Sequence, residues 1–291
     1  MKTCISTYSY WRHIAEKRMT YFDAIDETKK AGADAVEICV FDWAVPEGVD
    51  YGDYVTQLTA HAREIGLEVP MLTCAANLYC DEAEEVLKRL KSLVDVAAKN
   101  NIPMMRHDIT YRYMENDTLK TPQKVIKFVA PYVRELSLYA KEKGVKTCSE
   151  NHGRIINGGH IMEMLLNEVD CDNYGLLCDI SNFTSVDDDP VTAVGMLAQH
   201  ICFVHGKDAF FRDGMMFDPG EGFGRTRAGK FKRATIFGHG NVPTYQLLKV
   251  MKNAGYDGYI SMEFEGIEEN IMANRISIEN LKRMLAQLEK Q

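Results

Sequence analysis

Residues 147–153 read Thr-Cys-Ser-Glu-Asn-His-Gly and follow a helical run, residues 132–144, that ends at a glycine. The short segment 145–149 is typical of a buried strand, and the polar groups of Glu150 and His152 cannot continue it. In α/β folds, the loops after the carboxyl ends of parallel strands carry the active-site residues. A solvated turn explains this stretch equally well, so its meaning depends on whether the pattern repeats.

Size and composition narrow the class of protein. A chain of 291 residues can form two ordinary domains or one large α/β barrel. The formal net charge of −8 argues against nucleic acid or an anionic membrane as a partner. No apolar run approaches the roughly 18 residues of a membrane span. Residues 1–7 lack the apolar core of a signal peptide, so we expect a cytoplasmic protein.

The eight cysteines lie mostly inside or at the ends of apolar, strand-like runs, such as residues 38–40 and 201–203. Buried cysteine behaves as a small hydrophobic residue. No Cys-x-x-Cys pair occurs that would indicate a redox motif or a zinc ribbon. We therefore expect free thiols in a reducing compartment, with a cysteine nucleophile as the less favoured alternative.

Strand-like and helix-like segments alternate along the whole chain, and no linker separates them. The predicted strands are residues 2–8, 34–40, 67–74, 102–106, 145–149, 174–178, 201–204 and 258–262. The predicted helices are residues 19–31, 50–65, 80–100, 121–143, 159–169, 189–199, 244–253 and 268–288. Eight such units predict a single (β/α)₈ TIM barrel over residues 1–291, rather than an open doubly wound sheet. No glycine-rich nucleotide-binding motif follows any strand.

Two segments interrupt this regular pattern. Pro131 lies within the helix 121–143, where we expect a kink or a break. Residues 206–241, after the seventh strand, form a long segment rich in Gly, Arg and Phe that we expect to be a loop. This loop is interpreted as a lid, a phosphate site, a subunit contact or simply a solvated excursion. Its basic residues are Arg212, Arg225, Arg227, Lys230, Lys232 and Arg233.

Polar residues also end the last four predicted strands, namely Glu150, Asp179, His205 and Glu263. In a barrel, the ends of these strands converge on one mouth. Three carboxylates and one imidazole would repel one another unless a cation lies among them. An oxygen-rich set with one nitrogen suits Mn²⁺, Mg²⁺ or Co²⁺, and Zn²⁺ is compatible. Each residue alone could be a salt-bridge or capping residue, but the four together predict a divalent metal site.

Five motifs in this order resemble the xylose-isomerase-like (AP endonuclease 2-type) TIM-barrel superfamily of sugar phosphate isomerases and epimerases. They are Ser-Glu-Asn-His-Gly at 149–153, Leu-Cys-Asp-Ile-Ser-Asn at 177–182, Phe-Val-His-Gly-Lys-Asp at 203–208, Gly-His-Gly-Asn-Val-Pro at 238–243 and Gly-Tyr-Asp-Gly-Tyr-Ile-Ser-Met-Glu-Phe-Glu at 255–265. The resemblance implies one divalent metal, often Mn²⁺, bound through Glu150, Asp179, His205 and Glu263. It also implies that the two glutamates flank the substrate carbon and exchange its proton, and that the protein is a homodimer or homotetramer.

The chemistry of such a site follows from general principles. A metal that binds a ketose carbonyl lowers the pKa of the adjacent C–H and stabilises an enediolate, and a glutamate removes the proton. We therefore expect a metal-dependent isomerase or epimerase of a small sugar, ketose or polyol-derived carbonyl compound. The alternative is a lyase or dehydratase acting on a keto-inositol, dehydroshikimate or 3-keto-glycoside. A DNA-repair endonuclease and a non-catalytic barrel are less favoured.

Further residues are candidates for binding the substrate. They are His152, Lys207, His107, Asn182, Trp11 and Asn77, with the loop aromatics Tyr8, Trp43, Phe210 and Phe211 as stacking surfaces. Each has a structural alternative: the histidines could be structural, the aromatics simple packing, and Lys207 could pair with a carboxylate such as Glu37 or Asp208. Glu37 lies inside the second strand, so we expect it to have a polar partner in the mouth. Glu265 competes with Glu263 as a ligand.

Overall fold

Eight parallel strands close into a barrel in this computed structural model, which describes residues 1–290. Their order is β1-β11-β7-β6-β5-β4-β3-β2, and β11 closes the ring against β1. The predicted (β/α)₈ barrel is therefore confirmed. The barrel strands are β1 (Lys2–Ser6), β2 (Ala35–Cys39), β3 (Met71–Cys74), β4 (Met104–His107), β5 (Lys146–Glu150), β6 (Tyr174–Asp179), β7 (Ile201–Gly206) and β11 (Tyr259–Met262).

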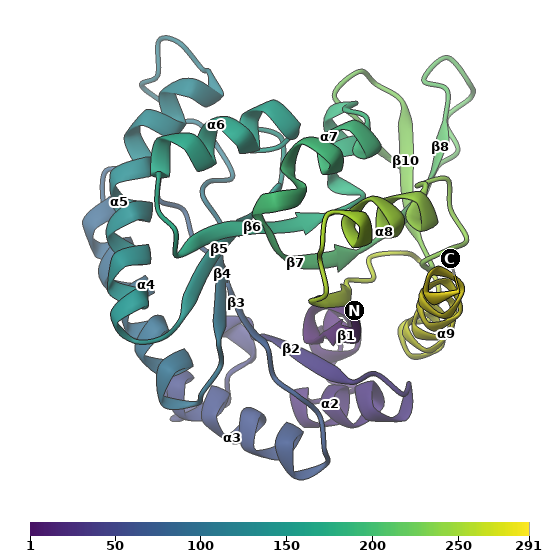
Figure 1. The fold of residues 1–291 in the computed structure, drawn as a ribbon, viewed down its shortest axis with the longest axis horizontal. Coiled ribbons are helices and arrows are strands. Elements are labelled where there is room, and N and C mark those ends of the chain that lie inside the picture. The colour runs from purple at the N-terminus through teal and green to yellow at the C-terminus, as the bar shows by residue number, and fades with distance from the viewer. Residues whose placement is uncertain (291) are drawn as a thin grey trace.

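Helices surround the barrel, and each barrel strand is followed by at least one (Figure 1). They are α1 (Trp11–Ala15), α2 (Tyr21–Lys30), α3 (Tyr51–Glu64), α4 (Ala83–Lys99), α5 (Pro122–Glu142), α6 (Gly159–Val169), α7 (Pro190–Leu197), α8 (Thr244–Asn253) and α9 (Asn270–Glu289). Helices α6 and α8 begin and end where the sequence predicts. Within residues 1–290, no helix combines the length and the apolar character that crossing a membrane requires.

The helix α5 continues through Pro131, so the expected split is wrong. A proline inside a helix removes one backbone donor and leaves a carbonyl oxygen without its partner. Pro131 is exposed, so water can reach that side of the helix. The neighbouring residues Ala130 and Val133 are buried against the core. Packing of this face therefore holds the helix together across the proline.

The barrel interior is apolar at the amino ends of the strands and polar at the carboxyl ends. The apolar layer is formed by Cys4, Ala35, Met71, Cys148, Leu177 and Phe203. A larger set of apolar side chains, including Leu176, Val204 and Ile260, fills the space between the strands and the helices. Because the apolar layer closes one end of the barrel, polar inward-facing residues further along the strands face the opposite mouth.

The segment 206–241, named here the extension, is not the structureless loop that the sequence predicts. It contains a three-stranded antiparallel sheet in the order β8-β10-β9, made of β8 (Asp208–Arg212), β9 (Gly224–Arg225) and β10 (Phe231–Thr235). In this sheet Phe211 pairs with Lys232 and Arg212 pairs with Phe231. Figure 1 shows β8 and β10 projecting beyond the ring of helices. The extension therefore has a fixed backbone that can present side chains to the barrel mouth.

One buried carboxylate, Asp208, connects the extension to the start of α8. Its two oxygens accept hydrogen bonds from the backbone N–H groups of Ala209, Gly238, Gly240 and Val242, at 2.8 to 3.1 Å. A Cβ atom at Gly240 would collide with this carboxylate, which explains why a glycine stands there. Asp208 therefore fixes residues 238–242 against β8.

We predict that Asp208→Ala lowers the free energy of unfolding by about 2–4 kcal/mol, because buried backbone N–H groups lose their acceptor. The measurement is the shift of the urea midpoint. The matched control is Asp218→Ala, which removes an exposed carboxylate that accepts one backbone N–H from Gly220 in the same extension. This control should change the free energy by no more than about 0.5 kcal/mol. Equal stability of the two variants would contradict the role given to Asp208.

Candidate metal centre

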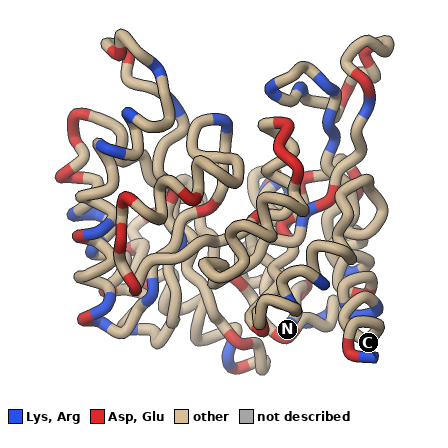
Figure 2. The backbone as a smooth tube through the Cα atoms, turned by 45° about the horizontal axis from the view of Figure 1, so that its top comes forward, with Lys and Arg blue, Asp and Glu red and all other residues tan. Residues whose placement is uncertain are grey.

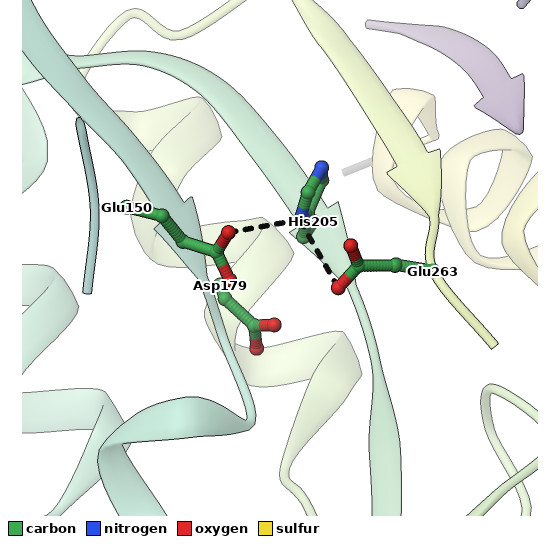
Figure 3. A group of neighbouring side chains, drawn as sticks. All are labelled: Glu150, Asp179, His205 and Glu263. Carbon is green, nitrogen blue, oxygen red and sulfur yellow. Dashed lines mark ion pairs between the residues drawn. The ribbon is translucent and has the colours of Figure 1, made fainter. Parts of the chain in front are cut away.

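Four side chains meet at the carboxyl ends of the last four barrel strands (Figure 3). Glu150 ends β5, Asp179 ends β6, His205 lies in β7 and Glu263 directly follows β11. Each offers one possible ligand atom, and these atoms all lie within 4.8 Å of one another. The exposed fractions of the four residues range from 0% to 8%. The four residues that the sequence singles out thus form one buried cluster.

The alternation of side chains along a strand explains why these residues share the barrel interior. Leu177 and Phe203 belong to the apolar layer. Asp179 and His205 follow two residues later on the same strands, so they point to the same side. The pairing of β6 with β7 places Asp179 directly opposite His205. The fold therefore brings an acidic residue and an imidazole together one layer above the apolar end of the barrel.

The charges of this cluster suit a cation. Burial raises the pKa of Asp179; the charge of Lys207 opposes this rise, and the carboxylates of Glu150 and Glu263 add to it. Two buried atoms lack a hydrogen bond within the described chain: His205 Nδ1 and Asp179 Oδ2, whose partner is the ammonium group of Lys207 at 3.1 Å. Three carboxylates and one imidazole nitrogen are also a donor set that divalent metals use. The residues present therefore fit a metal ion.

Glu37, inside β2, holds the ring of His205 from behind. Its carboxylate accepts hydrogen bonds from His205 Nε2 at 3.0 Å and from Ser261 Oγ at 2.7 Å. The expectation that this buried glutamate has a polar partner is met. Because Nε2 points to Glu37, Nδ1 faces the cluster, 3.7 Å from Glu150 Oε2 and 3.4 Å from Glu263 Oε2. Burial lowers the pKa of His205, but the carboxylates, led by Glu37, raise it well above its usual value.

Arg106, buried in β4, joins Glu150 to Asp108. Its Nη2 donates to Glu150 Oε2 and to Asp108 Oδ1, both at 2.6 Å, and Nη1 donates to Asp108 Oδ2 at 3.1 Å. His152 Nδ1 lies 2.9 Å from Asp108 Oδ1. Burial raises the pKa of Glu150, but the charges of Arg106 and His152 outweigh it and hold that pKa well below its usual value. Glu150 is therefore kept as a carboxylate.

The sequence analysis missed both Arg106 and Asp108. Arg106 is only the last residue of the predicted strand 102–106, and Asp108 is not among the candidate residues. A partial signal was present, because Asp108 is a carboxylate just beyond a predicted strand, as Asp179 is. Both residues are buried, at 6% and 4% exposure, which marks them as part of the barrel mouth.

Lys207 lies in the same cluster and is surrounded by carboxylates. Its Nζ is 3.1 Å from Asp179 Oδ2 and 3.2 Å from Glu265 Oε2, and it also forms an ion pair with Glu263. It thus pairs with these three residues rather than with Glu37. Burial raises the pKa of Glu263, but Lys207 and the neighbouring imidazole lower it to about 2.

Asn182 and His152 lie beside Glu150 at the rim of the cluster. Asn182 Nδ2 donates to Glu150 Oε1 at 2.8 Å, and the Asn182 backbone N–H donates to Asp179 Oδ1 at 2.9 Å. The side chain of His152 is 40% exposed and therefore reachable from solvent. These two predicted residues are in a position to contact a molecule in the mouth.

His107 was expected to line the mouth, but it does not. Its neighbours Arg106 and Asp108 face the cluster, and alternation along the strand turns His107 to the other side. Its ring lies 6.3 Å from the ring of Tyr174, and its Nδ1 is 3.1 Å from the backbone oxygen of Asp108. Burial lowers the pKa of His107 to about 4. It is thus a buried, neutral histidine between the strands and the helices.

The remaining candidates lie in the loops around the mouth. Trp11 begins α1 and is 37% exposed. Asn77 Oδ1 accepts a hydrogen bond from Thr110 Oγ1 at 2.7 Å, and it lines a separate cavity of about 320 Å³ with Tyr79. Tyr8 reaches the cluster more directly, because its hydroxyl donates to Glu265 at 3.1 Å. Tyr8 and Trp43 both pack against Phe41, with ring centroids at 5.8 Å and 5.3 Å. Stacking of the loop aromatics on a substrate stays a prediction.

Fold and site together define the class of this protein: a closed parallel barrel with a buried cluster of acidic and histidine side chains that suits a metal. The family model of the xylose isomerase-like TIM barrel matches residues 25–286. The chain belongs to this family. No curated protein matches the chain.

Solved structures of similar fold include an epimerase-like protein, a dehydratase and a metal complex. A D-tagatose 3-epimerase-like protein is 17% identical, with a TM-score of 0.74 over 100% of this chain and 99% of that one. The probable 3-DHS dehydratase AsbF of Bacillus anthracis is also 17% identical, with a TM-score of 0.74 over 97% and 99%. A xylose isomerase-like TIM barrel protein from Mycobacterium smegmatis, in complex with magnesium, is 16% identical, with a TM-score of 0.70 over 92% and 89%. At these identities the likeness concerns the fold.

We predict that Glu37→Ala weakens Mn²⁺ binding by about 10- to 100-fold, because it frees the ring of His205. Glu37→Gln should lose less Mn²⁺ affinity than Glu37→Ala, because its amide oxygen can still accept a hydrogen bond from His205 Nε2. The measurement is isothermal titration of chelator-treated protein with MnCl₂, with circular dichroism to establish folding. Glu68→Gln is the control, because Glu68 bonds to Lys2 at 2.6 Å, far from the cluster. Wild-type affinity in Glu37→Ala would contradict this role.

Proposed function

We propose that this chain is a divalent-metal-dependent isomerase or epimerase of a small sugar, ketose or polyol-derived carbonyl compound. The observation that carries the proposal is the single buried cluster of Glu150, Asp179, His205 and Glu263. We assign these four residues as the metal ligands, with Mn²⁺ as the favoured ion and Mg²⁺, Co²⁺ or Zn²⁺ as alternatives. The bound metal would polarise the substrate carbonyl and so acidify the adjacent C–H group.

Glu150 and Glu263 are the proposed proton-transfer residues. Two strands, β6 and β7, separate β5 from β11 in the barrel, so the two carboxylates approach the mouth from different walls. The pKa of each is held low despite burial, chiefly by Arg106 for Glu150 and by Lys207 for Glu263. Both are therefore present as bases. One removes the proton next to the carbonyl. Epimerisation then requires that the other takes up a proton from solvent and delivers it to the opposite face of the same carbon.

Residues at the rim would position the substrate. Asn182 contacts Glu150 and Lys207 contacts Asp179, which are both proposed metal ligands. Their side chains carry N–H groups that can donate hydrogen bonds to sugar hydroxyls. His152 is exposed on one side and joined to Asp108 on the other. We propose these three as substrate-binding residues. Trp11 and Asn77 remain predictions at the outer loops, and we expect no nucleic acid partner.

Lyase chemistry is the second candidate. One solved structure of similar fold is described as a probable 3-DHS dehydratase, and this supports the candidate. Loss of water needs the same proton removal and, in addition, an acid for the leaving hydroxyl. Burial lowers the pKa of His152, but its hydrogen bond with Asp108 and the charge of Glu150 raise it above the usual value, so His152 is suited to donate that proton.

We predict that Mn²⁺-loaded protein in D₂O incorporates deuterium next to the carbonyl of a substrate chosen from a panel of ketoses. Glu150→Gln and Glu263→Gln should each slow this exchange at least about 100-fold, because each removes one proton-transfer group. Glu265→Gln should slow it much less, since Glu265 reaches the cluster only through Lys207 and Tyr8. The measurement is NMR of the substrate, with metal content determined for every variant.

Exchange without loss of water supports the isomerase or epimerase, and loss of water supports the lyase. If metal-loaded protein exchanges no proton with any ketose of the panel, the proposed function is wrong. A larger effect of Glu265→Gln than of Glu263→Gln would reverse the assignment between these two residues.

A further inference from the structure

Lys232 reaches the barrel mouth from the extension. It lies on β10, and its Nζ donates hydrogen bonds to the backbone oxygen of Ser181 and to Ser185 Oγ, both at 2.9 Å. Ser181 is two residues beyond Asp179, and its own N–H donates to Asp179 Oδ1 at 2.8 Å. The ammonium group therefore lies on the turn that begins at one of the proposed metal ligands.

The surroundings of the half-buried Lys232 differ from those of the buried cations Arg106 and Lys207. Arg106 and Lys207 each form ion pairs with two or more carboxylates. Lys232 forms no ion pair within residues 1–290, and its two acceptors are a neutral carbonyl and a neutral hydroxyl. An ammonium group has three N–H donors, so one of them is available for a further acceptor.

The electrostatics agree with this geometry. Burial lowers the pKa of Lys232 to about 8, while the charge of Asp179 opposes the fall and the charge of Lys207 adds to it. A half-buried cation that has no direct ion pair gains from an anion placed against it. Figure 2 shows lysine and arginine positions in blue along the extension, with acidic positions in red between them.

We propose that Lys232 binds an anionic group of the substrate, a carboxylate or a phosphate, at the rim of the mouth beside Asp179. The inference rests on the proposed function, because it takes the reacting carbon to lie at the cluster of four residues. It adds a substrate class: a sugar acid or a sugar phosphate rather than a neutral ketose. The anion would accept the remaining N–H of Lys232 and supply the missing counter-charge.

A purely structural role for Lys232 would be to fasten the extension to the turn η3 (Asn182–Val186). Other contacts already do so. The Arg227 N–H donates to the backbone oxygen of Ser185 at 3.0 Å, and Thr226 Oγ1 donates to Asp187 Oδ1 at 2.9 Å. Lys230, two residues before Lys232, forms an ion pair with Asp187 at 3.4 Å. Lys230 therefore provides a matched control, a lysine that links the same two segments at a greater distance from Asp179 along the turn.

The test compares wild-type protein with Lys232→Met, Lys232→Arg and Lys230→Met, all as full-length, Mn²⁺-loaded chains. Binding of inorganic phosphate, gluconate and neutral fructose is measured by isothermal titration, together with the melting temperature of each variant. We expect phosphate or gluconate to bind the wild type, and Lys232→Met to weaken that binding at least tenfold. Lys230→Met should retain wild-type affinity, Lys232→Arg should retain most of it, and fructose binding should be the same in all four proteins.

Preference for phosphate identifies a sugar phosphate, and preference for gluconate identifies a sugar acid. For a substrate that carries this anion, Lys232→Met should raise KM at least tenfold with a smaller change in kcat. The proposal is overturned if the wild type binds neither anion. It is also overturned if Lys232→Met binds both anions as the wild type does, or if Lys230→Met loses affinity to the same extent. Wild-type KM and wild-type proton exchange in Lys232→Met, on a substrate that carries the anion, would refute this inference while leaving the proposed function intact.

Discussion

The mutual repulsion of carboxylates at one end of the barrel is the constraint on which the rest of the site depends. Two unit charges about 4 Å apart interact by roughly 4 kcal/mol at an effective dielectric constant of about 20. Glu150, Asp179 and Glu263 lie within such a distance of one another and are almost fully buried. Without positive charge among them, at least one would have to take up a proton.

The chain supplies part of that positive charge itself. Arg106 forms an ion pair with Glu150, and Lys207 forms ion pairs with Asp179 and Glu263. Each carboxylate of the cluster therefore has a cationic side chain beside it. Glu37 orients the remaining nitrogen ligand, His205, by accepting from its far side. This arrangement keeps both proposed proton-transfer residues deprotonated and leaves a position that a divalent metal suits. The proposed proton removal requires a deprotonated carboxylate, and a metal at this position would acidify the C–H group.

Much of this could be predicted from the sequence, because local rules decide it. Apolar runs that end in a polar residue predict the strands, and glycines predict several helix ends. The alternation of side chains along a strand places Asp179 and His205 on one face. Other features depend on tertiary contacts. Arg106 can be recognised as a residue of the site only from its contacts with Glu150 and Asp108 in the folded chain. His107 was misplaced by one step of the same alternation.

The extension shows a different limit. Its strands β8 and β10 are five residues each, and the 18 residues between them include a glycine-rich stretch and no long alternating run, so no sequence period marks the pairing. The carboxylate of Asp208 holds this segment through backbone groups distant in the chain, which a local pattern does not reveal. Pro131 likewise looked like a helix break, since its exposure could not be known beforehand. Long-range packing decides these cases.

The central claim is that Glu150, Asp179, His205 and Glu263 bind one divalent metal ion together. Anomalous diffraction from crystals grown with MnCl₂ tests it most directly. The account predicts one strong anomalous peak per chain inside the barrel mouth, at about 2.1 Å from an atom of each of the four side chains. A mouth without an anomalous peak, or a manganese ion bound only by residues outside this cluster, would contradict it.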